Sequence, residues 1–234
     1  MKLLLVAPAL AAAVLAFGAS PAGSAPRECQ GFMVCVPVRG PWVVVPTGNS
    51  VPRPHVEYQL TCPRNYVVGG LDAELSTRGI AISFIGRLGS PVNPGITTTR
   101  SAVFTAMYVG ATARAPSFRP HIGCIPGSGG GGVPTVYKVV RPGNPTVRRV
   151  ATVRVRPGSA QRVSKRCTRR EQLVDGSHAL AFRTTRPPSA ALVSGVRLTQ
   201  SFGRSAVSVA VRSDETLAGV SVFVQVHAIC SRVS

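Results

Sequence analysis

The chain has 234 residues and carries 27 Lys+Arg against 8 Asp+Glu, which gives a formal net charge of +19. Because 44% of the residues are apolar and only 15% are charged, the composition excludes a disordered basic tail. The 20 prolines and 24 glycines disfavour long helices. So few acidic residues also disfavour a calcium site built of carboxylates.

The first 25 residues are typical of a secretory signal peptide. Lys2 precedes an apolar run over residues 3–17, and small residues then offer cleavage sites after Ala22, Ser24 or Ala25. An N-terminal membrane anchor is the alternative, but the run is shorter than the ~20 residues that span a bilayer. No later stretch has 18 uninterrupted apolar residues. We therefore expect a mature chain without a transmembrane segment, secreted or associated with the cell envelope.

Six cysteines lie in the expected mature part of the chain, and an exported protein is expected to pair them as disulfides. The interval from Cys62 to Cys124 is almost equal in length to the interval from Cys167 to Cys230. These two near-equal intervals suggest a duplicated unit closed by equivalent bridges. The simplest pairing is therefore Cys62–Cys124, Cys167–Cys230 and a local Cys29–Cys35 bridge.

Further landmarks repeat between these cysteines. Arg-Ser-Ala-Val occurs at 100–103 and again at 204–207, and a His-x-x-Cys motif ends each interval, at His121 and His227. The segments YVVGGLDA (66–73) and QLVDGSHA (172–179) follow the first cysteine of each interval. The order and gaps of these landmarks predict a tandem repeat.

Alternation of apolar and polar residues predicts β-strands in both repeats. It occurs at 55–62, 101–109, 117–124, 205–211 and 220–230. In 117–124 the pattern places Phe118, Ile122 and Cys124 inward, with Arg119 and His121 outward. The predicted fold class is all-β, with tandem duplicated antiparallel β-sandwich units closed by disulfides.

The expected organisation has five parts: signal peptide 1–25, N-terminal segment with a small disulfide loop 26–41, β repeat 1 at 42–126, Gly/Pro-rich linker 127–146 and β repeat 2 at 147–234. The linker contains a literal G-x-G-x-x-G match at Gly127, Gly129 and Gly132. A dinucleotide site needs a helix after this motif, and Val133-Pro134 follows instead. We expect no cofactor.

The first repeat resembles repeats found in exported proteins of high-GC Gram-positive bacteria, which open with C-P-x-G-x-x-V-x-G-G-G-x-A and end at a second cysteine. Cys62-Pro63 and Val67–Ala73 carry the resemblance, which extends over repeat 1 and is weaker in the second repeat. Asn65 stands where the family usually has glycine, and Thr168 replaces the proline in the second repeat. The resemblance implies an exported β-sandwich module of no established activity.

Two sets of residues suggest catalysis or metal binding, and each also has a structural explanation. Asp175, Ser177 and His178 suggest a Ser-His-Asp set, but neighbouring residues on a strand face opposite sides, which favours a polar turn that starts a strand. His121 and His227 are not expected to ligate metal with oxidised cysteines and are interpreted as surface residues. No catalytic, cofactor-binding or metal-binding residue is predicted, and the chain is not expected to be an enzyme. Trp42, beside three valines, is interpreted as a core residue.

The acid-free interval between Glu74 and Glu171 contains 16 basic residues and predicts a surface that attracts polyanions. Residues 148–156 are expected to form a strand with an arginine-rich outer face. The densest basic run supplies the candidate binding residues: Arg148, Arg149, Arg154, Arg156, Arg162, Lys165, Arg166, Arg169 and Arg170. Arginine forks suit phosphate or carboxylate oxygens, whereas the run has no aromatic residues for base stacking.

The expected partner is an anionic cell-wall polymer or an acidic polysaccharide, with nucleic acid bound only non-specifically. The alternative function is a structural or protein-interaction module of the envelope, including an inhibitor-like role. A secreted hydrolase is a distant third. A basic composition that only keeps the protein soluble, without a specific ligand, is the simplest competing explanation.

Overall fold

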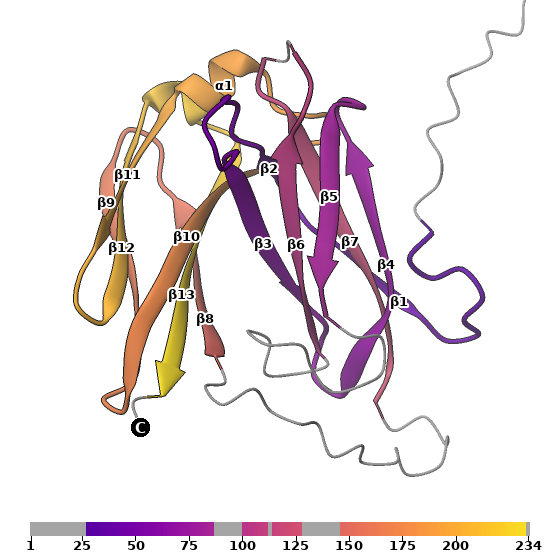
Figure 1. Cartoon of the computed structure of the whole chain (residues 1–234). Coiled ribbons are helices and arrows are strands. Elements are labelled where there is room, and N and C mark those ends of the chain that lie inside the picture. The colour runs from indigo at the N-terminus through magenta and orange to yellow at the C-terminus, as the bar shows by residue number, and fades with distance from the viewer. Residues whose placement is uncertain (1–26, 87–99, 112–113, 128–145, 233–234) are drawn as a thin grey trace, which may run out of the picture.

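The computed structural model describes residues 27–86, 100–111, 114–127 and 146–232 (Figure 1). Over these ranges the chain forms 13 strands, one short helix α1 (Ala190–Ser194) and a single 3-10 turn, so the protein is all-β as predicted. None of the helices in these ranges has the length and apolarity needed to cross a membrane. The predicted signal peptide and almost all of the predicted linker lie outside the described residues.

The strands form one long sheet and two short sheets, all antiparallel. The long sheet A has the order β4-β7-β1/β2-β10-β13-β8, where β1 and β2 follow one another along β7. Its strands are β1 (Val36–Arg39), β2 (Trp42–Val44), β4 (Tyr66–Leu75), β7 (Ser117–Pro126), β8 (Thr146–Val155), β10 (Glu171–Arg183) and β13 (Ser221–Arg232). Sheet B contains β3 (His55–Thr61), β6 (Ser101–Tyr108) and β5 (Ile80–Ile85), and sheet C contains β11 (Val196–Phe202), β12 (Ala206–Ser213) and β9 (Ala160–Arg166).

Strand β2 joins the two halves of sheet A. Val43 lies opposite Phe118 of β7 on one side and opposite Ala181 of β10 on the other. Strand β1, from the predicted N-terminal segment, also pairs with β7, so β1 and β2 lie one after the other along the same strand.

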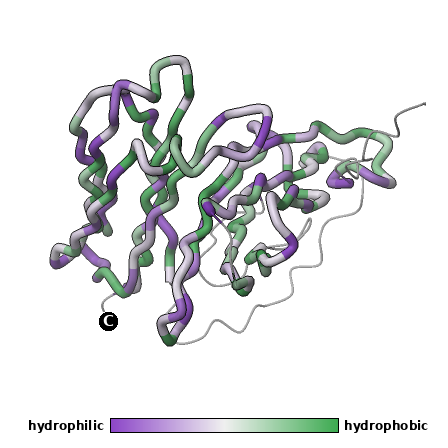
Figure 2. The backbone as a smooth tube through the Cα atoms, turned by 90° about the horizontal axis from the view of Figure 1, so that it is seen from above, coloured by the Kyte–Doolittle hydropathy of each residue, from purple (hydrophilic) through white to green (hydrophobic). Residues whose placement is uncertain are grey.

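Sheets B and C cover opposite faces of sheet A and enclose two hydrophobic cores (Figures 1 and 2). Val43 and Ala181 belong to the first core, under sheet B, whereas Val44 and Phe182 pack in the second, under sheet C. This change of face follows from alternation, since neighbouring residues of one strand point to opposite sides. The result is two sandwiches that share one sheet.

The predicted inward residues lie in these cores. Phe118, Ile122 and Cys124 are buried in the first core, and Val222, Val224, Val226, Ala228 and Cys230 are buried in the second. Trp42 is also buried, as predicted.

All three predicted disulfides are present: Cys29–Cys35, Cys62–Cys124 and Cys167–Cys230. The two long bridges each connect the end of the outermost strand of a small sheet to the facing strand of sheet A. Three bridges and no free cysteine in the chain indicate an oxidising compartment.

The two sandwiches share one topology. The order β3-β6-β5 over β4-β7 in the first matches β9-β12-β11 over β10-β13 in the second. Each long strand also has a bulge at the same place, between Val68 and Gly70 and between Leu173 and Asp175. Common topology is what a duplication would produce, but the duplication itself stays a prediction.

The proposed sequence landmarks of the repeat do not all superpose. Ala102 lies opposite Leu60, two residues before Cys62, whereas Val207 lies opposite Lys165, two residues before Cys167. The Arg-Ser-Ala-Val motifs are therefore shifted by one residue relative to each other, and the shift turns the side chains to opposite faces. The segments 66–73 and 172–179 are also shifted by one residue.

Candidate polyanion-binding face

The outer face of sheet C combines small residues with arginines. Val163, Val207, Val209, Val211 and Leu198 point into the second core or pack against it, so the alternate residues point outward. The outward set contains four exposed arginines and no acidic residue: Ala160, Arg162, Ser164 and Arg166 of β9; Ala206, Ser208, Ala210 and Arg212 of β12; Arg197, Thr199 and Ser201 of β11. We call this surface the arginine face.

The strand register brings three of these arginines together. Arg197 lies directly opposite Arg212, and Arg162 lies opposite Ala210, one row along the sheet from Arg212. Among the described residues, no carboxylate forms an ion pair with any of them. Like charges directly opposite on neighbouring strands destabilise a sheet. An anion bound between the two guanidinium groups would attract both of them and so offset their repulsion.

The arrangement suits a linear chain of anions better than a single small ligand. Arg166 lies four residues from Arg162 on β9, about 13 Å along the strand at ~3.3 Å per residue. The small neighbours leave the guanidinium groups open to solvent, and each can bind a phosphate or carboxylate with two parallel hydrogen bonds.

Only two of the nine predicted binding residues, Arg162 and Arg166, belong to the arginine face. Lys165 points to the other side of β9, since it has the parity of the buried Val163. The exposed arginines of the run that lie elsewhere are Arg154 on β8, Arg156 between β8 and β9, and Arg169 and Arg170 between β9 and β10. The basic run therefore does not form one continuous seam.

Arg197 and Arg212 were missed by the sequence analysis. The alternation in 205–211 places Ser208 and Ala210 on the polar side, and Arg212 continues that side. The alternation could therefore have placed Arg212 on the outer face, but Arg197 could be placed beside Arg212 only with the register of β11 and β12.

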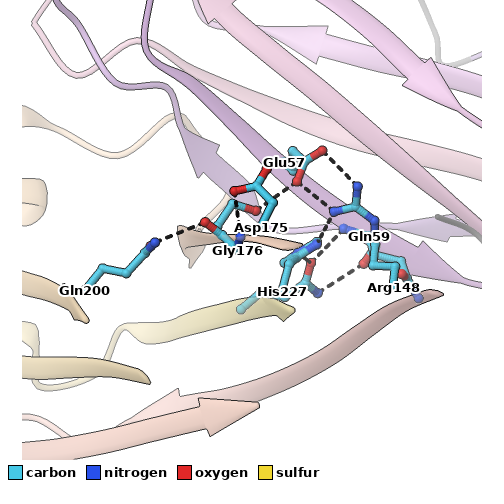
Figure 3. Close-up of polar contacts among 9 residues, drawn as sticks. Glu57, Gln59, Arg148, Asp175, Gly176, Gln200 and His227 are labelled. Carbon is cyan, nitrogen blue, oxygen red and sulfur yellow. Dashed lines mark hydrogen bonds and ion pairs between the residues drawn. The ribbon is translucent and has the colours of Figure 1, made fainter. Parts of the chain in front are cut away.

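Strand β8 forms as predicted, and Arg154 near its end is exposed, but Arg148 near its start is covered. Arg148 is buried between the sandwiches, where it contacts Glu57 of β3 (Figure 3). Nη1 donates to Glu57 Oε2 at 2.6 Å, and Nη2 donates to Oε1 at 2.9 Å. The two side chains are only 6% and 13% exposed. Arg149 points to the opposite face and pairs with Glu171.

The carboxylate and guanidinium belong to a larger buried network. Arg148 Nη1 lies 2.8 Å from Nδ1 of His227, and the hydroxyl of Ser177 donates to Glu57 at 2.8 Å. His227 Nε2 lies 2.7 Å from Oε1 of Gln225. Since arginine can only donate, Nδ1 of His227 is the acceptor and Nε2 carries the proton.

The side chain of Gln225 links the two sandwiches by hydrogen bonds to the backbone of β3. Its Oε1 accepts from the Gln59 amide at 2.6 Å, and its Nε2 donates to the Gln59 carbonyl at 3.2 Å and to Thr152 at 3.0 Å. The side chain thus bonds β3 as a neighbouring strand would. The network is a polar joint that fixes the first sandwich against the second.

The charges in this joint are set by burial and by Arg148. Burial is the main cause that lowers the pKa of His227 to about 3, and the Arg148 charge adds to it. Burial raises the pKa of Glu57, but hydrogen bonds and charge from Arg148 outweigh it, so the net direction is downward. At neutral pH the joint therefore holds one ion pair and a neutral imidazole.

The prediction that His121 and His227 are surface residues is wrong, because both side chains are fully buried. Each faces away from the small sheet of its own sandwich, as the alternation indicated. Another part of the chain covers that side: β3 lies over His227, and Glu28 lies over His121, whose Nδ1 is 3.6 Å from the Glu28 carboxylate. His121 Nε2 lies 3.0 Å from Glu74.

Arg119 was also predicted to face solvent and is instead buried at 8% exposure. Its guanidinium lies 4.5 Å from the centre of the Trp42 ring and donates to the carbonyls of Thr184 and Thr185. Arg119 therefore ties β7 of the first sandwich to the end of β10.

The residues Asp175, Ser177 and His178 do not form a catalytic set. They lie within β10 next to its bulge, so the predicted polar turn is wrong. The Ser177 hydroxyl donates to Glu57, whereas His178 bonds Gln200 within the second sandwich. Their side chains point to opposite faces, as predicted.

One cluster has the composition of a metal site. Cys167, Cys230 and Glu171 place ligand-type atoms within 4.8 Å of one another. The two cysteines form a disulfide and cannot supply thiolates. Glu171 accepts two hydrogen bonds from Arg149, at 2.9 and 2.7 Å, which are the main cause that lowers its pKa to about 2. The cluster is a salt bridge beside a disulfide.

In comparisons with known proteins, no family model, curated protein or solved structure matches this chain.

Proposed function

We propose that this chain is an exported, non-catalytic β-sandwich protein that binds an anionic surface polymer through the arginine face. The polymer would be an anionic cell-wall polymer or an acidic polysaccharide. The observation that carries the proposal is the set of four exposed arginines on one sheet face, none of which forms an ion pair with a carboxylate of the described residues.

The energetics of the face support a binding role. Arg197 and Arg212 lie directly opposite each other on adjacent strands, where like charges are unfavourable, and a bound anion would relieve this repulsion. Polyanion phosphates or carboxylates would supply such an anion, with an affinity that falls as salt screens the charges. By contrast, Arg148 and Arg149, which connect strands within the fold, each pair with a carboxylate.

The test is a map of the binding surface in solution. Amide chemical shifts would be followed by NMR while polyglycerol phosphate, and separately heparin, is added to the exported protein. The proposal predicts saturable shifts that concentrate on β9, β11 and β12. Shifts spread over all exposed basic segments, including the turns with Arg156 and Arg169, would show non-specific attraction and would contradict the proposal.

A further inference from the structure

Residues 27–35 form a strap that lies across the first sandwich. At one end, the amide of Arg27 donates to the carboxylate of Asp72 on β4 at 2.7 Å, while the Arg27 side chain is exposed. At the other end, the strap continues into β1, which pairs with β7. The strap is therefore attached to sheet A at both ends and covers part of the face that sheet B leaves free.

Glu28 is buried between the strap and the sheet. A Cβ on Gly70 or Gly123 would overlap the Glu28 carbonyl, so the backbone of the strap lies directly on β4 and β7. The Glu28 side chain is only 5% exposed, and its Oε1 lies 3.6 Å from Nδ1 of His121. Among the described residues this carboxylate has no other ion-pair partner, and its Oε2 accepts no hydrogen bond. The buried charge of Glu28 thus depends on one imidazole.

His121 has a carboxylate at each of its two ring nitrogens. Nε2 lies 3.0 Å from Glu74 of β4, whereas Nδ1 faces Glu28, and the side chain is fully buried. Neither nitrogen forms a hydrogen bond in the described part of the chain, so both are ion-pair contacts. A neutral imidazole has one N–H and one acceptor nitrogen, and the acceptor would direct its lone pair at a carboxylate. Only the imidazolium form presents an N–H to both carboxylates.

The charges around His121 balance only when its ring is protonated. Residues directly opposite His121 on its two neighbouring strands lie on its own face of the sheet. The ionisable groups that face it are Glu28 of the strap, Asp72 and Glu74 of β4, Arg39 of β1 and Arg119 of β7. These are three carboxylates and two guanidinium groups. A neutral His121 therefore leaves one negative charge in excess, and a protonated His121 leaves none.

We propose that the protonation state of His121 controls the docking of the strap. The protonated ring neutralises Glu28, and the strap stays on the sheet. Loss of the proton to solvent leaves the Glu28 carboxylate buried without a cation, which favours its movement into water and lifts the strap from β4 and β7. Docking and protonation favour each other, so docking is strongest at mildly acidic pH and weakens as the pH rises. This switch lies on sheet A and does not rest on the function proposed for the arginine face.

NMR contacts between the strap and the sheet test this proposal. Cross-peaks between Glu28 and the Hα protons of Gly70 and Gly123 can be followed at every pH, because carbon-bound protons do not exchange with water. In the exported protein with intact disulfides, they should lose at least about half of their intensity between about pH 5.5 and about pH 8.5, a range over which histidine side chains lose their proton. Contacts within sheet C should keep their intensity. Strap contacts of equal intensity at both pH values would overturn the proposal.

Three variants assign the response to this pair of side chains. Glu28→Gln removes the carboxylate, so the strap contacts should become independent of pH over this range. His121→Gln replaces the ring by a side chain that cannot take a proton, and should weaken the contacts at both pH values. His55→Gln removes an exposed histidine of β3 and should respond like the wild type. If Glu28→Gln shows the same pH response as the wild type, the proposal is wrong, whatever the result for His121→Gln.

Discussion

His227 shows how one buried side chain connects protonation to stability. It is fully buried, accepts from Arg148 and donates toward Gln225, so protonation would place a second cation against the guanidinium. The alternation around His227 predicts only which face of β13 the side chain lies on. The strand that covers this face, β3, belongs to the first sandwich and lies far earlier in the chain. For this reason its burial could not be predicted from alternation.

The first prediction concerns the pH dependence of this group. The folded pKa of His227 is about 3, below its ordinary value of 6.5, so the unfolded chain binds the extra proton first as the pH falls. The stabilising contribution is full above about pH 6.5 and declines progressively toward pH 3. Urea unfolding at several pH values should show this decline in the wild type and a flatter profile in His227→Gln. Parallel profiles would contradict the assignment.

The second prediction concerns the ion pair beside it. Arg148→Met leaves the buried Glu57 carboxylate without its partner and should lower the unfolding free energy by about 3–5 kcal/mol. The double variant Arg148→Met/Glu57→Gln removes both charges and should recover a substantial part of that loss. Chemical denaturation of the two variants checks this expectation. If the double variant is no more stable than the single variant, the unpaired Glu57 carboxylate is not the cause of the lost stability.

At the scale of strands, alternation was the reliable signal. It placed strands at 55–62, 101–109, 117–124 and 220–230, and the core residues of these strands are as predicted. Strand β2 has only three residues and no alternation to read, so its pairing with both β7 and β10 could not be derived. Strand β9 was hidden because four of its seven residues are charged or amide-bearing.

The bridge between strand ends supports the third prediction. Cys167 and Cys230 are separated by 63 positions, so their disulfide should contribute roughly 4 kcal/mol in the chain-entropy view, against about 2 kcal/mol for the short Cys29–Cys35 ring. We expect Cys167→Ala/Cys230→Ala to lower the denaturant midpoint clearly more than Cys29→Ala/Cys35→Ala does. Equal losses would indicate that the second sandwich does not depend on its own bridge.

For the whole molecule, fold class and disulfide pairing could be predicted from the sequence, and the binding surface only in part. Net charge and the acid-free interval located the excess of arginine, but strand direction decides where each side chain points. Neighbouring Arg148 and Arg149 point to opposite faces, and each forms an ion pair with a carboxylate. In contrast, Arg162, Arg197 and Arg212 come from three separate strands and lie near one another on one face. The candidate site depends on the register between strands that lie far apart in the sequence, and composition holds no information about that register.

The most direct test of the arginine face compares two variants of identical net charge. One changes Arg162, Arg166, Arg197 and Arg212 to threonine, and the control changes four exposed arginines off that face: Arg154, Arg156, Arg169 and Arg170. Binding of both to polyglycerol phosphate would be measured by calorimetry at several salt concentrations. We predict that the arginine-face variant loses at least about tenfold in affinity, with a shallower salt dependence, while the control stays close to the wild type. Equal losses in the two variants would show that only total charge matters and would contradict the proposed function.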